Sequence, residues 1–585
     1  MRPTYLLSFL LLVALLIGCT SRNIADHSIE QNFASEFNVE NYDQYYELDP
    51  EGRSFKSSQK ISIINVSEKY TNQINFSLHP KLVIDQIIIR NFSGKEIPIK
   101  QWNKIGATRT SRIWAETSLN EFPVYQIQTK ESIAPRQQLF FEIEYHLDVG
   151  FIRDYPEKMY ELTVSPKASY AVGPFTGHNP FFGRNLSAPF TIAIKHLKDF
   201  YTCAPGKLIT SKQENQFVID IYECKFPNIP TFSCAQYKKI SRQSDTFRLE
   251  YYLYPDQQVT EEMIDTTFRV IDLYSKTFGD NGTREYRFGT VGKAKSRNLG
   301  GENKGNAIFL TDYATRLYTS WLLNWATNLF TGGLSGKEAN FLFFSHELYH
   351  NWNLFYVHWS GKLYEWFGEG GANFIAAWAA EKVIGIEAGA QARKFFIKSF
   401  IKNKGYEAGQ PLESVRKTGK AESALMYKYG AIVWEQLRRK LGDDAFFAGL
   451  GEFYREKGFK QATYEDLLAS LQARADIDVK KFLSQWTTEN AKIKVTIGDV
   501  SIQKRGIGFR TNVEIEVDSE KDYDIVTAIG YKTSQQENLT IVPINITQNG
   551  KYVHILDTQQ KPTYIQIDPY FSVPRINIGN CEWEG

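Results

Sequence analysis

The sequence predicts a multidomain α+β protein, and three changes along its 585 residues support this. Residues 59–240 show short runs of alternating polar and apolar residues, separated by Gly, Pro, Asn and Asp, as in an antiparallel β saddle or sandwich. Residues 241–490 pass from mixed strands and helices into long stretches with a period of 3.6. Residues 491–585 return to alternating strands, which predicts a small C-terminal β-sandwich.

The first 58 residues are predicted to be a leader and a tether. A basic residue, Arg2, precedes an apolar run that is too short to cross a bilayer, so residues 1–18 are expected to be a signal peptide. The end of this segment, Leu-Ile-Gly-Cys19, looks like a bacterial lipobox. This resemblance implies that Cys19 is lipidated and anchors the chain to a membrane, facing an extracytoplasmic compartment; if the host is Gram-negative, this is the outer membrane. Residues 19–58 are polar and short of aliphatic residues, as in a lipid-anchored tether.

Composition narrows the function classes. The formal charge of +2 favours neither nucleic acid nor an acidic substrate as partner. No later apolar run approaches the length of a transmembrane helix. Apart from Cys19 there are four cysteines, an even number in a compartment where disulfides form. Cys203 and Cys224 flank a predicted hairpin, so they are either a disulfide or two separate buried thiols.

The strongest motif is His346-Glu347-Leu348-Tyr349-His350, an HExxH sequence. Two histidines four residues apart lie on one helical face, so both imidazoles can reach one metal ion while Glu347 points at its open side. Glu369 follows His350 after eighteen residues, in a second predicted helix. His346, His350 and Glu369 are therefore predicted to bind one zinc ion and to leave a position open for water.

Two neighbouring features support this site. Ser335 and Glu338 have the spacing of a capping box, which places the start of the histidine-bearing helix. Asn373 lies four residues after Glu369, on the same helical face, where it is either a hydrogen-bond partner of a ligand histidine or an ordinary surface amide.

Two segments outside the motif are further candidates. Glycines around Glu302, in Gly300-Gly301-Glu302-Asn303, let the backbone approach a ligand while the carboxylate faces a cation such as a substrate's α-ammonium group. A turn with a solvated acid is the alternative. Downstream, Tyr427 opens a long amphipathic stretch. A tyrosine near zinc can stabilise an oxyanion, although a buried core position explains Tyr427 equally well.

Taken together, HELYHNW, WFGEG and Tyr427-Lys428-Tyr429-Gly430 resemble the patterns of the aminopeptidase N family of gluzincin zinc metallopeptidases. The segment from Gly300 to Gly305 is similar to that family's GxMEN motif. The resemblance implies a thermolysin-like catalytic domain with a helical C-terminal half, one zinc ion per chain, and peptide or protein substrates with a free amino terminus. It also implies that Glu347 is the general base, Glu302 the anchor for the amino terminus and Tyr427 the oxyanion stabiliser.

The chain departs from the family pattern at several positions. Gly301 stands where GxMEN has methionine, Asn353 follows Trp352 in place of phenylalanine, and Tyr429 replaces a lysine. The Trp352-Asn353 pair resembles instead the glycyl aminopeptidases, which have a longer interval to their glutamate and a GGLEH motif. A glycyl-aminopeptidase-like enzyme, an endopeptidase with an open cleft, and a zinc-binding pseudoenzyme or binding lipoprotein therefore remain as alternatives.

Overall fold

The computed structural model describes residues 36–109, 121–147, 154–155, 162–172, 178–182, 187–292, 301–312, 334–416, 419–534 and 538–585. The predicted signal peptide, Cys19, the first part of the predicted tether and Gly300 lie outside these ranges. The chain divides into two compact units: residues 1–237, 290–300 and 310–314 form the first, and residues 238–289, 301–309 and 315–585 the second. Within the described residues, no helix is both long and apolar enough to span a membrane.

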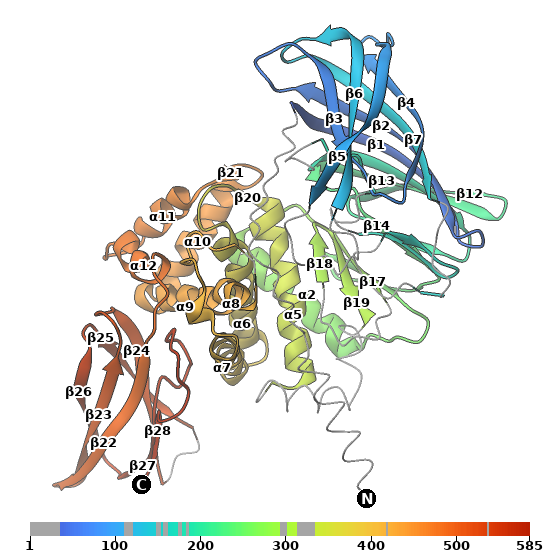
Figure 1. Ribbon diagram of the computed structural model, residues 1–585. Coiled ribbons are helices and arrows are strands. Elements are labelled where there is room, and N and C mark those ends of the chain that lie inside the picture. The colour runs from blue at the N-terminus through green and yellow to red at the C-terminus, as the bar shows by residue number, and fades with distance from the viewer. Residues whose placement is uncertain are drawn as a thin grey trace, which may run out of the picture. The chain divides into compact units, whose positions relative to one another are not determined.

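The first unit is built from β-sheets (Figure 1). Its largest sheet has seven strands, in the order β12-β13-β10-β1-β2-β7-β4, and only the β1–β10 pair is parallel. The strands are β1 (Phe37–Asp49), β2 (Ser54–Asn65), β4 (Val83–Asn91), β7 (Gln138–Leu147), β10 (Ala188–Leu197), β12 (Lys207–Glu214) and β13 (Phe217–Asn228).

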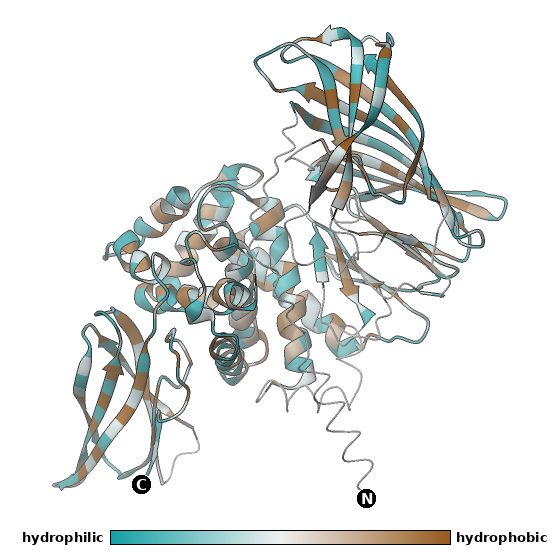
Figure 2. Ribbon diagram, viewed as in Figure 1, coloured by the Kyte–Doolittle hydropathy of each residue, from teal (hydrophilic) through white to brown (hydrophobic). Residues whose placement is uncertain are grey.

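Two smaller sheets complete this unit. One is formed in the order β3-β6-β5 by β3 (Thr71–Ser77), β5 (Ile99–Arg109) and β6 (Glu121–Ile133). The other is formed in the order β11-β14-β9-β8 by β8 (Thr163–Val164), β9 (Ala168–Ala171), β11 (Tyr201–Cys203) and β14 (Phe232–Ala235). Teal and brown residues alternate along many of these strands, the pattern of one buried and one solvated face (Figure 2).

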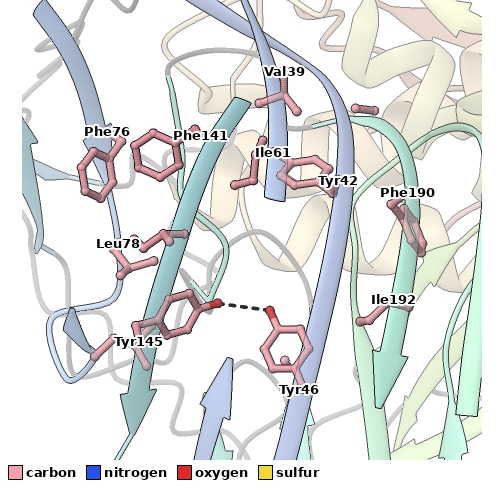
Figure 3. Packing of buried hydrophobic residues seen from close by; sticks show 14 of the residues in the cluster. Val39, Tyr42, Tyr46, Ile61, Phe76, Leu78, Phe141, Tyr145, Phe190 and Ile192 are labelled. Carbon is pink, nitrogen blue, oxygen red and sulfur yellow. Dashed lines mark hydrogen bonds between the residues drawn. The ribbon is translucent and has the colours of Figure 1, made fainter. Parts of the chain in front are cut away.

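Aromatic side chains fill much of the core of this unit (Figure 3). A register shift in β1 between Val39 and Asn41 moves the buried positions from odd to even residue numbers, so that Tyr42 and Tyr46 point inward. The Tyr46 hydroxyl lies 3.3 Å from that of Tyr145, and Gln59 donates a hydrogen bond to Tyr46 over 2.9 Å. The hydroxyl groups of Tyr46 and Tyr145 are therefore satisfied inside the core.

The prediction that residues 19–58 form a tether is wrong for its second half. β1 and β2 are the fourth and fifth strands of the seven-stranded sheet, with neighbours on both sides. Tyr42, Tyr46, Leu48 and Phe55 supply the buried face. Aromatic rings form the buried face of these two strands, so they lack the aliphatic residues that usually indicate a strand.

Of the two alternatives for Cys203 and Cys224, the structure shows the separate buried thiols and not the disulfide. Cys203 and Cys224 are buried thiols that are not joined to each other. Cys203 lies on β11 of the four-stranded sheet, whereas Cys224 lies on β13 of the seven-stranded sheet. The hairpin is formed by β12 and β13, so Cys203 precedes it and belongs to another layer. Burial raises the pKa of the Cys224 thiol.

The second unit begins with a five-stranded sheet and a helix. The strand order is β15-β16-β17-β19-β18, which makes β18 an edge strand. The strands are β15 (Lys238–Gln243), β16 (Arg248–Leu253), β17 (Glu285–Val291), β18 (Gly301–Lys304) and β19 (Ala307–Thr311). Helix α2 (Glu261–Phe278) connects β16 to β17, and the Thr260 side chain caps it by accepting from the Met263 N–H.

Helices make up the middle of the second unit, shown in yellow to orange in Figure 1. The α-helices are α5 (Gly336–His350), α6 (Gly371–Val383), α7 (Ile386–Lys402), α8 (Lys420–Ala424), α9 (Gly430–Leu441), α10 (Asp443–Lys457), α11 (Tyr464–Gln472) and α12 (Val479–Thr487). Three π-helical turns, η2 (Asn351–Tyr356), η3 (Trp366–Gly370) and η5 (Leu425–Tyr429), and a 3₁₀ turn, η4 (Gly405–Glu407), interrupt them. Two short strands, β20 (His358–Trp359) and β21 (Gln461–Ala462), pair in parallel.

The C-terminal part of the second unit contains two antiparallel sheets, β22-β23-β26 and β25-β24-β27-β28. The strands are β22 (Lys494–Arg505), β23 (Gly508–Asp518), β24 (Ile525–Thr533), β25 (Thr540–Ile546), β26 (Gly550–Thr558), β27 (Pro562–Ile567) and β28 (Glu582–Glu584). Gln436 on α9 joins them to the helices, because its amide donates to the carbonyls of Val526 and Ser572 over 2.8 Å each. The predicted α+β class is confirmed, with a β-rich N-terminal region and helices followed by strands.

Candidate metal centre

Helix α5 holds the two histidines of the motif on a fixed element. Ser335 accepts a hydrogen bond from the Glu338 N–H over 3.1 Å, and the Glu338 carboxylate accepts from the Ser335 N–H over 2.7 Å. This is the predicted capping box, which satisfies two N–H groups at the start of the helix. His346 and His350 lie at its far end, and both are buried.

The three predicted metal ligands lie together. Nε2 of His346 is 3.1 Å from Nε2 of His350 and 3.2 Å from Oε2 of Glu369, and the His350–Glu369 distance is 3.7 Å. Tetrahedral zinc with ligand bonds of about 2.0–2.1 Å would set such atoms about 3.3 Å apart. The observed distances bracket that value, and a group of two imidazoles and one carboxylate is a donor set that zinc favours.

The electrostatics of this group call for a positive charge within it. Burial lowers the pKa of His350 to about 4, so its Nε2 carries a lone pair. Burial would also lower the pKa of His346, but the hydrogen bond and the charge of Glu369 outweigh that effect and raise it. A proton on His346 can supply the positive charge in the absence of metal, and a zinc ion bound by all three residues supplies it otherwise. The residues therefore fit the metal.

Two buried asparagines orient the ligand histidines. Asn373 donates to the Tyr427 carbonyl over 2.8 Å, so its Oδ1 accepts from Nδ1 of His346 at 3.1 Å. Asn353 donates to the carbonyls of Phe367 and Gly368 over 3.0 and 2.7 Å, and its Oδ1 lies 3.0 Å from Nδ1 of His350. Each contact fixes the ring so that Nε2 faces the metal position.

Asn373 was predicted from its helical spacing, whereas the role of Asn353 was missed. Asn353 lies three residues after His350, a spacing that could have indicated it. Its side chain also connects α5 to the segment that carries Glu369. These contacts give a structural reason for the asparagine at position 353, where the family pattern has phenylalanine.

Residues of the centre lie on all three π-helical turns. Asn353 belongs to η2, Glu369 to η3 and Tyr427 to η5. Each turn is continuous with an α-helix, so it shifts the side-chain register locally without ending the helical axis. π-Helical turns of this kind are frequent at functional sites.

Glu347 has the properties of a general base. Burial raises its pKa to about 7, with contributions from the nearby charges of Glu369 and Glu302. Asn303 on β18 donates a hydrogen bond to the Glu347 backbone carbonyl, which links this strand to α5. A carboxyl group with a pKa near neutrality can both accept and release a proton under physiological conditions.

Position 301 has no room for a side chain, because Phe343 and Glu347 lie close to it. A Cβ atom at position 301 would lie 2.6 Å from the Phe343 ring and 2.8 Å from Oε1 of Glu347. Both distances are shorter than real contacts of a Cβ atom. The glycine that replaces the family's methionine therefore matches a site in which Phe343 and Glu347 already occupy this volume.

Glu302 lies on the same strand and faces a cation. One carboxylate oxygen contacts the Lys304 ammonium group, and both side chains are largely buried. The other oxygen is buried without a hydrogen-bond partner among the described residues. An orphaned carboxylate oxygen beside the catalytic glutamate is the kind of acceptor that a ligand ammonium group would satisfy.

Tyr427 lies against the first histidine. Its ring stacks on that of His346, with centroids 6.2 Å apart and planes 16° apart. Burial, together with the charge of Glu369, raises its pKa well above the usual value. The phenol consequently stays protonated near neutral pH and can donate a hydrogen bond.

Comparison with known proteins agrees with this geometry. Residues 331–486 match the peptidase family M1 domain. The match includes all three ligands, Glu347 and Tyr427. Glu302 lies ahead of it.

Three similar proteins are named aminopeptidases. Over 175 residues the chain is 29% identical to Aminopeptidase M1 of Arabidopsis thaliana, covering 27% of this chain and 19% of the relative. It is 24% identical over 152 residues to Aminopeptidase N of Lactobacillus helveticus, covering 23% and 18% respectively. It is 23% identical over 166 residues to Aminopeptidase 2, mitochondrial, of Saccharomyces cerevisiae, covering 24% and 17%. The match thus spans less than a fifth of each relative, and it supports the resemblance to the aminopeptidase N family.

Proposed function

We propose that this chain is a zinc-dependent metallopeptidase that removes residues from the amino end of peptides. The observation that carries the proposal is the convergence of His346, His350 and Glu369 within ligand distance, with Glu347 beside them. Such a three-residue donor set leaves a coordination position open, which is typical of catalytic rather than structural zinc.

The roles of the side chains follow from their positions. When bound, zinc supplies Lewis-acid activation of water and of the scissile carbonyl. Glu347, with its pKa raised by burial to about 7, is placed to take a proton from the attacking water and to pass it to the leaving amine. Tyr427, held in its protonated form, is placed to donate a hydrogen bond to the oxyanion.

The choice of an aminopeptidase rests on Glu302. Its free carboxylate oxygen can accept a substrate's α-ammonium group, which would set the distance from the amino terminus to the scissile bond. Gly301 and Asn303 support this position, because one leaves room for Glu347 and the other joins β18 to α5.

The test compares peptides with free and acetylated amino termini. The wild-type chain should cleave Ala-Ala-Ala and leave acetyl-Ala-Ala-Ala intact. Glu302→Ala should lower kcat/KM for the free peptide by at least about tenfold, because a charge-assisted hydrogen bond is lost. Equal cleavage of both peptides by the wild type would contradict the proposal and indicate the endopeptidase alternative.

We further propose that the enzyme acts in a bacterial cell envelope, held to a membrane by a lipid on Cys19. The support is the lipobox-like sequence before Cys19 and the apolar run that precedes it. Labelling of cells with a radioactive fatty acid should mark the wild-type protein and not Cys19→Ala. Equal labelling of both would contradict the proposed anchor.

A further inference from the structure

A lysine beside the metal centre has no role in the mechanism described above. Lys428 follows Tyr427 on η5, and its ammonium group lies 6.0 Å from the centroid of the Tyr427 ring. Its charge acts on both Glu369 and His346, which places it in the electric field of the ligand group. The residue is partly buried.

Two aromatic rings on α7 hold this ammonium group in place. Nζ of Lys428 lies 5.3 Å from the Phe395 ring centroid and 5.0 Å from that of Phe396, within the range of cation–π contacts. Within the described part of the chain, no carboxylate lies at ion-pair distance from Lys428, in contrast to many other lysines of the protein. The cation is therefore oriented but not neutralised.

The surroundings of Lys428 disfavour its charged form unless an anion lies close to it. Burial lowers the pKa of Lys428 to about 8, although Glu369 opposes the shift. With a metal ion bound, the Glu369 carboxylate would be engaged as a ligand and would compensate Lys428 less. An incoming carboxylate would restore the balance, because charge-assisted hydrogen bonds are strongest in partly desolvated sites.

Glu302 and Lys428 lie on different elements of the centre. The Glu302–Lys304 ion pair on β18 acts on Glu347, and Lys304 also acts on His350, whereas Lys428 on η5 acts on His346 and Glu369. Glu302 keeps an oxygen without a hydrogen bond, and Lys428 keeps an ammonium group without a carboxylate. A short peptide is a zwitterion with the same polarity, an ammonium group at one end and a carboxylate at the other.

We propose that Lys428 is a specificity-determining residue that binds a carboxylate of the substrate on the far side of the scissile bond from its amino terminus. The carboxylate is either the free C-terminus of a short peptide or an acidic side chain of a longer one. This proposal rests on the proposed peptidase function and names the substrate class of the same site. Charge-bearing hydrogen bonds of this kind correspond to at least about a tenfold gain in kcat/KM.

The experiment uses the full-length, zinc-loaded chain and two pairs of peptides. Ala-Ala-Ala and its C-terminal amide differ only in the terminal carboxylate, and Ala-Glu-Ala-amide and Ala-Gln-Ala-amide differ only in the side chain. The variants are Lys428→Met, which removes the charge, and Lys428→Arg, which keeps it. Lys402→Met is the matched control, because Lys402 is an exposed lysine at the end of the neighbouring helix α7.

The wild type and Lys402→Met should prefer the carboxylate-bearing member of at least one pair by about tenfold, chiefly through KM. The pair that shows the preference identifies the source of the carboxylate. Lys428→Met should cleave both members within about twofold of each other, and Lys428→Arg should keep a preference.

Two results would overturn the inference and spare the proposed function. One is a wild-type enzyme that cleaves all four peptides without a charge preference. The other is a Lys428→Met variant with equal losses on every peptide, which would indicate that Lys428 supports Tyr427 or the fold instead. Absence of cleavage of any free peptide by the wild type would overturn the proposed function together with this inference.

Discussion

Replacing Asn353 by alanine should weaken zinc binding, although it leaves the ligands and Glu347 unchanged. The side chain is fully buried, and its amide contacts Nδ1 of His350 and the carbonyls of Phe367 and Gly368. Alanine removes these three hydrogen bonds, although the Gly368 carbonyl keeps the Gly371 N–H as a donor. Each lost hydrogen bond costs about 1 kcal/mol, so we expect the free energy of unfolding to fall by about 2–3 kcal/mol.

Loss of the Asn353 side chain should lower the affinity for zinc because the His350 ring is no longer held in one orientation. Without Asn353, His350 loses the acceptor that fixes its tautomer and its angle, and η3 loses a contact that positions Glu369. Loss of such an outer partner typically reduces metal affinity by about 10–100-fold. Asn373→Ala should have an effect of similar size, through His346.

The assay is a zinc competition titration against a chromophoric chelator, combined with urea unfolding. Asn351→Ala is the matched control, because Asn351 is also buried, lies two residues from Asn353 and donates its side-chain hydrogen bond to the Leu348 carbonyl. Zinc affinity should be unchanged in Asn351→Ala and reduced at least about tenfold in Asn353→Ala. Equal zinc affinities in the two variants would refute the reasoning.

Two further outcomes follow from the structure. Gly301→Ala should keep its zinc and its melting temperature but lose about 100-fold in kcat/KM. The new methyl group would displace the Glu347 carboxylate, and a displacement of about 1 Å is enough for such a loss. Full activity of Gly301→Ala would contradict the close contact between position 301 and Glu347. In the first unit, burial would raise the pKa of Asp220, but hydrogen bonds from His196, Ser211 and Thr202 lower it. Its stabilisation is therefore present at neutral pH and lost as the pH falls through the lowered pKa. Urea unfolding should show wild type more stable than Asp220→Asn by about 3 kcal/mol at pH 7, with a gap that narrows towards pH 3; a constant gap would contradict this.

The metal ligands and their supports were largely predictable because they follow helical geometry. The four-residue spacing of His346 and His350 fixes their common face, and the capping box at Ser335 fixes where the helix begins. Asn373 follows from the same periodicity. Asn353 also has a helical spacing from His350, but it lies on a π-helical turn, so its contacts with Phe367 and Gly368 do not follow from that spacing.

Contacts between segments far apart in the chain could not be predicted from the sequence. Neither the sheet that receives Cys203 nor the ring pair of α7 under Lys428 can be deduced from local pattern, since both depend on packing between segments far apart in the chain. The missed strands β1 and β2 have a different cause. Their inward face is formed mainly by tyrosine and phenylalanine, which also occur in polar surface segments.

The most direct test of the central claim measures zinc content and peptide turnover in one preparation of Glu347→Gln. Glutamine keeps the shape of the side chain and cannot accept the proton, while His346, His350 and Glu369 stay unchanged. About one zinc ion per chain with negligible turnover of Ala-Ala-Ala is the expected result. Turnover at the wild-type rate would contradict the assignment of this site as a zinc peptidase centre.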